Sequence, residues 1–393
     1  MTHILKKHIV NFIIKVEKVT RVLEVIYGFG YGGIRAFLMN YLQHIDKDKF
    51  KIDIYVFGYD SSPFTDKVKE MGVGIYFQPE NNVRNIPHFV SQLKTFMDEH
   101  GPYDVVHANN NLISAWVLLA AKLAKVPIRL SHSHATEHYG NSLAQRMYAN
   151  MRRLMIEVLA TKKLACGQLA GEAMYKSKTG FEIISNGIAI DRFIDINEAK
   201  VDKLRKQLNI PIGAKVYANV SRMDSGKNHI FALQVFKEIK KREPNAVFLY
   251  GGVNPKIDST LEYIKSKVIE LKLEDSCIYT DPIMEVEILY HLTDVWIYCS
   301  LNEGLPFGPI ELQAASIPLI ASDVITPEID LGLGLVHFLP LTDSFEKWAD
   351  LAISLEKRII PKEVITEAFR KHNFDITKNV KKLETIYDDT FEN

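Results

Sequence analysis

The stretch "SLNEGLPFGPIELQAASIPLIASD" (300–323) contains a loop, a helical pattern and a short apolar run in succession. Glycine and proline between Glu303 and Glu311 interrupt regular structure and expose backbone N–H groups. The segment "ELQAAS" (311–316) predicts a helix that begins at Glu311, and "IPLIAS" (317–322) predicts a strand. This order is typical of parallel α/β sheets, and it places two carboxylates, eight positions apart, at one loop.

The same alternation of short strands and longer helical patterns extends in both directions along the chain. It starts at residue 22 and begins again near residue 215, after the charged segment 197–211. We therefore expect an α/β protein with two Rossmann-like, doubly wound parallel-sheet domains that face a central cleft, where ligands bind beyond the carboxyl ends of the strands. The predicted strands are 22–27, 50–57, 104–108, 128–133, 162–166, part of 181–193, 215–221, 246–252, 276–280, 294–300 and 317–322.

The length of 393 residues exceeds one ordinary core and fits two domains. We expect an N-terminal extension (1–20), a first domain (21–195), a second domain (196–372) and a C-terminal helix (373–393) that crosses back to the first domain. The extension contains Lys15, Glu17 and Lys18 within its apolar run, so we interpret it as an amphipathic segment rather than a signal peptide.

Composition favours a globular protein, with 47% hydrophobic and 24% charged residues and no apolar run of about 18 residues. Cys166, Cys277 and Cys299 are an odd number and lack C-x-x-C spacing. Packed, reduced thiols are the simpler interpretation, which predicts a cytoplasmic location.

The charge is unevenly distributed although the formal net charge is zero. Residues 1–195 contain 24 basic and 18 acidic side chains, and the remainder contains 24 and 30. A basic first half predicts contact with an anionic partner, either a phosphorylated acceptor or the inner face of the cell membrane as a peripheral protein, and segment 146–163 concentrates the charge. An ordinary solvated helix face is the alternative. No nucleic-acid partner is expected.

Two loops could bind phosphate. In "YGFGYGGIRAF" (27–37) a glycine-rich turn precedes a helix, whose N-terminus attracts anions; its spacing differs from G-x-G-x-x-G, and a tight structural turn is the alternative. In "SRMDSGKNH" (221–229), Arg222 and Lys227 follow a strand and would direct two cations at a departing diphosphate, unless they are ordinary surface charges.

Carboxylates and histidines supply further candidates. Glu311 could accept both hydroxyls of a ribose and Glu303 could face a sugar ring, although a helix cap and a surface acid are commoner fates. His107, His132 and His134 follow predicted strands and could bond a sugar hydroxyl, or they could fill a structural network. No H-E-x-x-H spacing supports a metal site.

With these residues the chain resembles the retaining glycosyltransferases of family 4, which have the GT-B fold, and in particular the branch of exopolysaccharide and capsule biosynthesis. The last of the matching stretches contains the E-x7-E element of that family. In chain order, these stretches are "GFGYGGIRAFLMNYLQHID", "YDVVHANN", "RLSHSHA", "ISNGIAIDRF", "VSRMDSGKNH", "LYGG" and "SLNEGLPFGPIELQAASIPLIASD".

The resemblance implies a role for each candidate. Glu311 would hold the donor ribose, Glu303 the donor sugar, and Arg222 with Lys227 the departing diphosphate, without a metal or another cofactor. The family commonly has an acidic residue where this chain has Arg35. The resemblance places the remaining candidates as follows: His134 near the anomeric carbon; Gly32, Gly33, Gly251, Gly304, Leu305, Pro306 and Phe307 on the donor side; and His107, Asn109 and His132 on the acceptor or sugar side.

The resemblance thus implies retaining transfer of a hexosyl or N-acetylhexosaminyl group from a nucleoside-diphosphate sugar, with UDP as the expected nucleotide, to a lipid-linked or oligosaccharide hydroxyl acceptor. Two alternatives stay open. A sugar-nucleotide 2-epimerase uses the same two-domain cleft, and a non-catalytic subunit could keep the fold in order to position a partner transferase.

Overall fold

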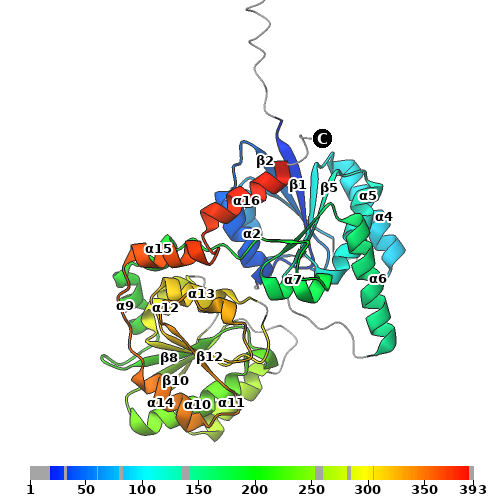
Figure 1. The fold of residues 1–393 in the computed structure, drawn as a ribbon. Coiled ribbons are helices and arrows are strands. Elements are labelled where there is room, and N and C mark those ends of the chain that lie inside the picture. The colour runs from blue at the N-terminus through cyan, green and yellow to red at the C-terminus, as the bar shows by residue number, and fades with distance from the viewer. Residues whose placement is uncertain are drawn as a thin grey trace, which may run out of the picture.

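The computed structural model describes residues 18–30, 33–59, 61–78, 83–134, 142–252, 260–280, 285–303 and 305–388. These residues form two domains, each built on a parallel sheet with helices on both faces (Figure 1). The predicted fold class is therefore confirmed. Gly32 and Gly304, two of the candidate donor-side residues, lie outside the described residues.

The first sheet has seven strands in the order β3-β2-β1-β4-β5-β6-β7. Its reversal between β1 and β4 is the switch point at which loops diverge and leave room for a ligand. Two apolar layers enclose it, one with α2 and α16 and the other with α4, α5 and α6. The elements are β1 (Thr20–Ile26), α2 (Gly33–His44), β2 (Phe50–Val56), α3 (Thr65–Glu70), β3 (Gly74–Phe77), α4 (Ile86–His100), β4 (Val105–Ala108), η1 (Asn111–Ile113), α5 (Ser114–Leu123), β5 (Ile128–Ser133), α6 (Leu143–Leu159), β6 (Lys162–Ala165), α7 (Gln168–Tyr175) and β7 (Glu182–Ile183).

The second sheet has six strands in the order β10-β9-β8-β11-β12-β13. Helices α9, α12, α13 and α15 contribute to the core on one face, and α10, α11 and α14 to the core on the other. The elements are α8 (Asp191–Ile194), α9 (Glu198–Gln207), β8 (Val216–Val220), η2 (Ser225–Lys227), α10 (His229–Arg242), β9 (Val247–Gly251), α11 (Thr260–Glu270), β10 (Cys277–Thr280), α12 (Val286–Leu292), β11 (Val295–Tyr298), α13 (Phe307–Ala314), β12 (Leu319–Ser322), η3 (Pro327–Ile329), β13 (Val336–Leu339), α14 (Phe345–Ser354), α15 (Lys362–Lys371) and α16 (Ile376–Asp388).

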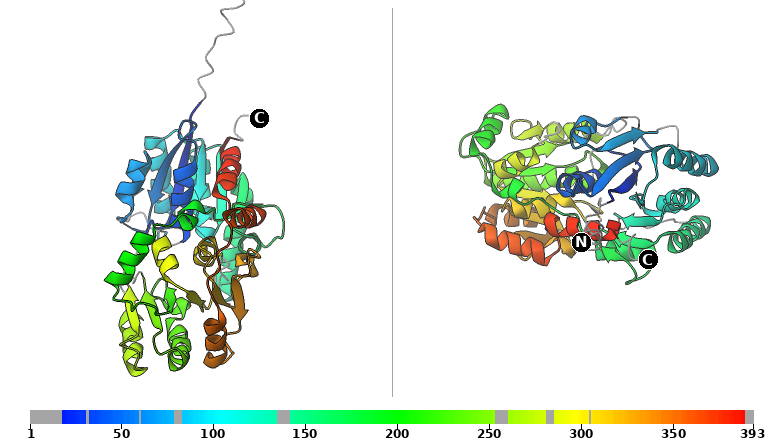
Figure 2. Two further views of the ribbon diagram at one scale, coloured as in Figure 1. Left: turned by 90° about the vertical axis from the view of Figure 1, so that its left-hand side faces the viewer. Right: turned by 90° about the horizontal axis from the view of Figure 1, so that it is seen from above.

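The last helix, α16, leaves the second domain and packs on α2 and β1 of the first. Figure 2 shows it beside the first domain from two further sides. Its apolar residues Ile376, Val380 and Leu383 belong to the core of that domain. The buried positions recur at helical spacing, so the helix turns one apolar face toward this surface. The domain bounds expected from the sequence, 21–195, 196–372 and 373–393, stay predictions.

Two predicted elements need correction, and two strands were missed. Helix α13 begins at Phe307 and not at Glu311, because Pro306 occupies its N-cap and the next residues already adopt helical geometry. Strands β3 and β13 were not predicted, because they are short edge strands with only partly buried side chains. The strand expected within 181–193 has only two residues, Glu182 and Ile183.

Candidate active site between the two domains

A cleft of about 730 Å³ lies between the two domains and is lined by residues of both. The α2 wall of the first domain faces η2, the end of β11 and α13 of the second. Most of the candidate residues therefore come together although they are up to 278 positions apart in the chain. The candidates that line the cleft are Gly33, His134, Arg222, Lys227, Glu303, Leu305, Pro306, Phe307 and Glu311.

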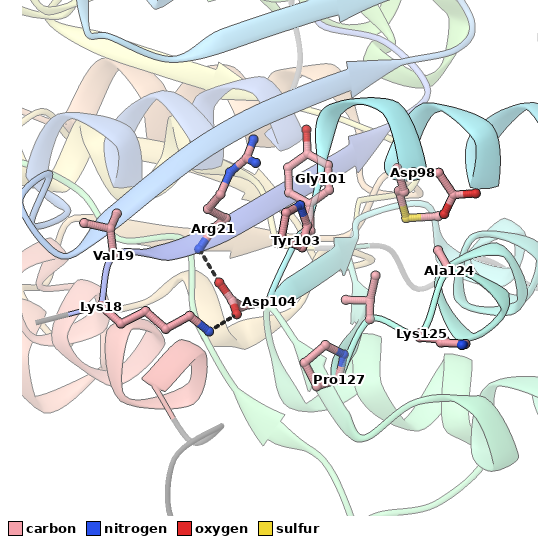
Figure 3. A pocket seen from close by; sticks show the side chains of 13 residues that line it. Lys18, Val19, Arg21, Asp98, Gly101, Tyr103, Asp104, Ala124, Lys125 and Pro127 are labelled. Atoms are coloured by element: carbon pink, nitrogen blue, oxygen red, sulfur yellow. Dashed lines mark hydrogen bonds and ion pairs between the residues drawn. The ribbon is translucent and has the colours of Figure 1, made fainter.

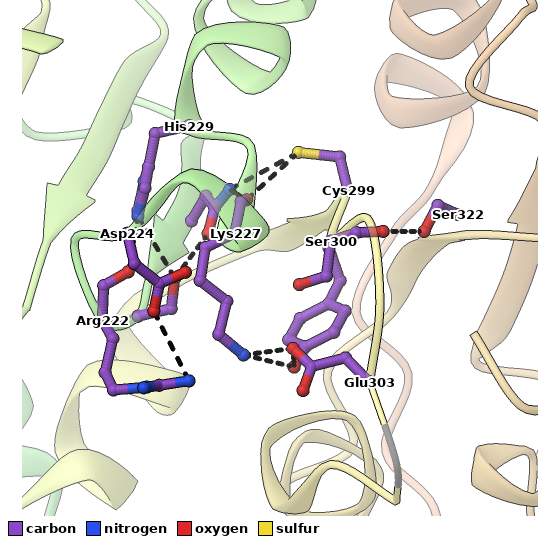
Figure 4. A network of polar contacts seen from close by, with 11 residues as sticks. Arg222, Asp224, Lys227, His229, Cys299, Ser300, Glu303 and Ser322 are labelled. Carbon is purple, nitrogen blue, oxygen red and sulfur yellow. Dashed lines mark hydrogen bonds and ion pairs between the residues drawn. The ribbon is translucent and has the colours of Figure 1, made fainter. Parts of the chain in front are cut away.

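Lys227 and Glu303 form an ion pair at the second-domain wall (Figure 4). The Tyr298 hydroxyl donates to Glu303 Oε1 at 3.0 Å and lies 3.4 Å from Lys227 Nζ. Burial and the Glu303 carboxylate raise the pKa of Tyr298 well above its ordinary value, so the hydroxyl stays protonated as a donor. A backbone bond from Leu301 N–H to the Gly226 carbonyl, 2.8 Å long, ties the two loops together.

Arg222 follows β8 and lies beside Asp224, with 3.4 Å between Nη2 and Oδ2. Its side chain is 53% exposed, which leaves the guanidinium accessible from the cleft that it lines. Beneath it, His229 Nε2 contacts the Arg222 carbonyl at 3.2 Å. The turn thus holds its backbone in place while two cations, Arg222 and Lys227, line the same cavity.

Glu311 lies in the second turn of α13, where it is half-buried and accepts a 2.8 Å hydrogen bond from the Tyr290 hydroxyl. Burial raises the pKa of Glu311, while the Tyr290 bond and the positive charges of Arg192 and Arg35 act in the opposite direction. Arg35 belongs to α2 of the first domain, so its charge acts on Glu311 across the cleft. Its guanidinium lies 4.3 Å from the centre of the Phe64 ring.

The first turns of α2 and α13 face each other. A Cβ atom on Gly33 would lie 4.0 Å from Phe307 Cε2, and Phe307 packs against the cores of both domains. The first N–H groups of a helix have no intrahelical partner and attract anions. Because Phe307 and Gly308 line the cleft, the start of α13 can present such groups to a phosphate. Asn186 Nδ2 also bonds the Leu305 carbonyl across the domains, at 3.1 Å.

Only one of the three candidate histidines lines the cleft. His134 does so, whereas His107, His132 and Asn109 are fully buried beneath it. These three residues were expected on the acceptor or sugar side, but in the structure they do not reach the cleft. The histidine rings pack against one another in the sheet core: the His132 ring centre lies 4.0 Å from that of His134 and 5.2 Å from that of His107.

Two members of this buried cluster were missed in the sequence. Glu24 of β1 and Tyr387 of α16 are bonded to each other and to His107. A single carboxylate in the apolar run "VLEVIY" is a signal that could have identified Glu24. Tyr387 gives no such signal, because its helical pattern does not reveal which strand it meets.

Gly251 ends β9 and does not appear among the residues that line the cleft. Glycine is required there for two reasons. Its φ is 139°, and a Cβ at this position would lie 2.2 Å from the Thr280 carbonyl oxygen. The role of Gly251 on the donor side stays a prediction. The three cysteines are free and buried, as expected.

A second hollow, of about 610 Å³, lies where β1 and β4 begin, away from the cleft (Figure 3). Two of its cations are paired: Lys18 Nζ lies 2.5 Å from Asp104 Oδ1 of the lining, and Arg21 Nη2 lies 3.3 Å from Asp53 Oδ2, outside the lining. The hollow is lined by the first domain alone. We therefore take the cleft as the candidate active site.

In the part of the chain that the structure describes, no group of three or more His, Cys, Asp or Glu side chains is arranged to hold a metal ion. Over the same ranges, every helix is too short or too polar to cross a bilayer.

Acidification is expected to destabilise the protein through its buried histidines. Burial lowers the pKa of His134 to about 3 and that of His229 to about 4, and it lowers the pKa of His132 well below its ordinary value near 6.5. The unfolded chain therefore binds more protons below pH 6.5, so this contribution to stability is complete above that pH and is lost progressively toward pH 3.

The measurement is the thermal midpoint between pH 8 and pH 4.5. We expect it to fall once the pH drops below about 6.5, and to fall less steeply in His134→Gln, which lacks one of these groups. His88→Gln, at an exposed position, is the control and should follow the wild type. Identical slopes for all three proteins would contradict the assignment.

The sequence and the fold match known proteins over nearly the whole chain. The model described as Glycosyltransferase Family 4 matches residues 31–192, and the model described as Glycosyl transferases group 1 matches residues 200–329. The chain is 28% identical over 373 residues to EpsF of Bacillus subtilis, which carries the name of a glycosyltransferase, covering 93% of this chain and 96% of the relative.

Two further proteins are similar at lower identity. A UDP-Gal:alpha-D-GlcNAc-diphosphoundecaprenol alpha-1,3-galactosyltransferase of Escherichia coli is 22% identical, with 91% of this chain and 95% of the relative covered. The crystal structure of Anabaena HepE in complex with UDP and glucose superposes with a TM-score of 0.76 at 14% identity, over 93% of this chain and 98% of the other.

Proposed function

The chain belongs to glycosyltransferase family 4 and has the GT-B fold, and from this we propose that it transfers a sugar from a nucleoside-diphosphate donor to a hydroxyl acceptor in the synthesis of a cell-surface polysaccharide. The observation that carries the proposal is the cleft itself. It gathers Arg222, Lys227, Glu303 and Glu311 on one wall and His134 on the other. UDP is the proposed nucleotide, supported by the names of the E. coli relative and of the HepE complex.

The proposed position of the donor follows from the charged and polar groups on the second-domain side of the cleft. The ribose hydroxyls would donate to Glu311, and the diphosphate would lie between the start of α13 and the cations Arg222 and Lys227. The phosphate would compete with Glu303 for Lys227, since the two are paired in the free protein. Glu303, released in part, could then accept hydrogen bonds from the donor sugar.

The proposed reaction retains the configuration at the anomeric carbon. The bond between that carbon and the phosphate oxygen breaks, and the acceptor oxygen attacks on the same face. Its proton passes to an oxygen of the departing diphosphate. Arg222 and Lys227 stabilise the charge that develops there, as preorganised cations do in water-poor sites. Closure of the two domains would exclude water, which otherwise hydrolyses the donor.

Purified protein incubated with a panel of nucleotide sugars, with and without membrane extract, tests the activity. Release of nucleoside diphosphate that depends on the extract supports transfer. Free epimerised sugar without an acceptor would instead support the 2-epimerase. If every donor is inert, the non-catalytic partner subunit becomes the better account.

We further propose that the acceptor is lipid-linked and that α6 brings the protein to an anionic membrane surface. Exposed apolar side chains form a stripe along this helix, which we call the α6 stripe: Leu143, Met147, Met151, Leu154 and Val158, of which Leu143 is 75% exposed. They recur every three or four residues and so share one side of the helix.

Charge favours a lipid surface over a second copy of the chain as the occupant of this stripe. Arg146, Arg152 and Arg153 lie on the same helix, with Glu157 as its one acidic residue. Of these, Arg146 is exposed, and anionic lipid would complement its charge, whereas Arg152 and Arg153 are half-buried and Arg153 Nε donates to the Met174 carbonyl at 3.0 Å.

Flotation with vesicles containing anionic lipid tests this surface. Met147→Ser and Leu154→Ser should each weaken binding roughly tenfold, because each removes apolar area that would enter the interface. Ile212→Ser and Ile359→Ser, at fully exposed positions of the second domain, are matched controls and should bind like the wild type. Unchanged binding of the α6 variants, or a change in their oligomeric state by gel filtration, would contradict the lipid assignment.

A further inference from the structure

A buried hydrogen-bond network connects the C-terminal helix to the cleft. It begins at Tyr387, whose hydroxyl donates to Glu24 Oε1 at 2.7 Å. Glu24 Oε2 accepts from Asn109 Nδ2 at 2.7 Å, and Asn109 Oδ1 lies 2.7 Å from His134 Nε2. The network therefore ends on the one histidine of the cluster that lines the cleft.

A carboxylate at position 24 is energetically unfavourable for the folded protein. It lies in the middle of β1, paired in register with His107 of β4, and only 2% of it is exposed. A buried carboxylate costs several kcal/mol unless its oxygens are satisfied, and an apolar residue there would avoid the cost. Its oxygens are occupied by Tyr387, Asn109 and His107, with His107 Nδ1 at 3.1 Å. A carboxylate at this position is thus explained best by what it orients.

The polarity of the network follows from its acceptor. An ionised carboxylate only accepts hydrogen bonds, so Asn109 must turn its NH₂ group toward Glu24. Its carbonyl oxygen then faces His134 Nε2, which must carry the proton in order to donate. Burial and the Glu24 charge raise the pKa of Tyr387 well above its ordinary value, which keeps its hydroxyl protonated at the other end.

We propose that Glu24 is the positioning residue for His134: through Asn109 it fixes the ring with its proton on Nε2 and its lone pair on Nδ1. This inference rests on the proposed function, because it assumes that His134 acts beside the reacting sugar. A lone pair on Nδ1 can accept a hydrogen bond from a sugar hydroxyl, which the opposite tautomer cannot do. The His134 backbone N–H, bonded to Asn111 Oδ1 at 3.1 Å, holds the ring's attachment point.

The direct test is the ¹⁵N spectrum of histidine-labelled protein, in which a protonated and an unprotonated ring nitrogen have well-separated shifts. His134 is assigned by comparison with His134→Gln. We expect protonation at Nε2 in the wild type. Protonation at Nδ1 would overturn the proposal, and this measurement needs no donor. If no nucleotide sugar reacts, the proposed function fails while the tautomer result stands.

Two variants separate positioning from general stability. Glu24→Leu removes the anchor of Asn109, and turnover should fall about 10- to 100-fold, as for losses of residues that orient an active group, with nucleotide affinity unchanged and the His134 tautomer no longer fixed. Tyr387→Phe removes one bond to the same carboxylate but keeps the anchor, so its tautomer and turnover should stay near those of the wild type.

Equal losses of turnover in both variants, or full turnover in Glu24→Leu, would overturn the proposal. If Glu24→Leu does not fold, Asn109→Ala takes its place, because it breaks the same connection while leaving Glu24 and Tyr387 bonded. It should then show the same loss of turnover and the same change in the His134 signal, and wild-type behaviour in either would count against the proposal.

Discussion

Lys227→Ala is expected to lower turnover by about 10²–10³-fold, the usual loss when one preorganised group that stabilises a developing charge is removed. The ammonium group lines the cleft beside Glu303 and Tyr298. In the proposed reaction it meets the diphosphate as negative charge builds up on it. The loss should therefore appear in turnover more than in donor affinity, because the interaction strengthens in the transition state.

The measurement is the rate of nucleoside diphosphate release at saturating donor and acceptor. Lys347→Ala is the matched control, since Lys347 also pairs with a carboxylate of the second domain, Asp343, but lies away from the cleft. The control should react like the wild type. Normal turnover in Lys227→Ala would remove this residue from the mechanism.

Glu311→Ala is expected to weaken nucleotide binding by about 10- to 100-fold, which corresponds to the loss of hydrogen bonds to a charged acceptor. The carboxylate is held in place by Tyr290 and lies within reach of the charges of Arg192 and Arg35. Because the carboxylate is already held in place, it can accept hydrogen bonds from ribose hydroxyls without rearranging. The replacement should act on affinity for the free nucleotide as much as for the nucleotide sugar.

Calorimetric titration with the nucleoside diphosphate measures this effect. Glu363→Ala, an exposed position on α15, provides a control with the same chemical change. Unchanged affinity in Glu311→Ala would contradict the ribose role. A loss of turnover alone, with affinity intact, would move Glu311 to the chemical step.

Much of the second domain could be predicted from local pattern. Helix α10 (His229–Arg242) is of this kind, because its buried residues recur at helical spacing. Strand β12 follows α13 closely, as expected from the loop, helix and strand of 300–323. Edge strands such as β3 escaped prediction, since half-exposed side chains give neither an alternating nor a fully apolar pattern.

The candidate site divides in the same way. Arg222 and Glu303 lie in loops, Lys227 in η2 and Glu311 in the second turn of α13. All four are within a few residues of a strand, so a sequence motif can place them at the cleft. The residues that position His134 could not be predicted from the sequence, because they depend on which side chains of β1, β4 and α16 meet in the core. Glu24 and Tyr387 are 363 positions apart, and no local signal connects them.

A crystal structure of the protein with its preferred nucleotide sugar tests the account most directly. The account predicts the donor in the cleft between the domains, its ribose on Glu311, its diphosphate in contact with Arg222, Lys227 and the first turn of α13, and its sugar between Glu303 and His134. A donor bound elsewhere, or a diphosphate that none of these groups approaches, would contradict it.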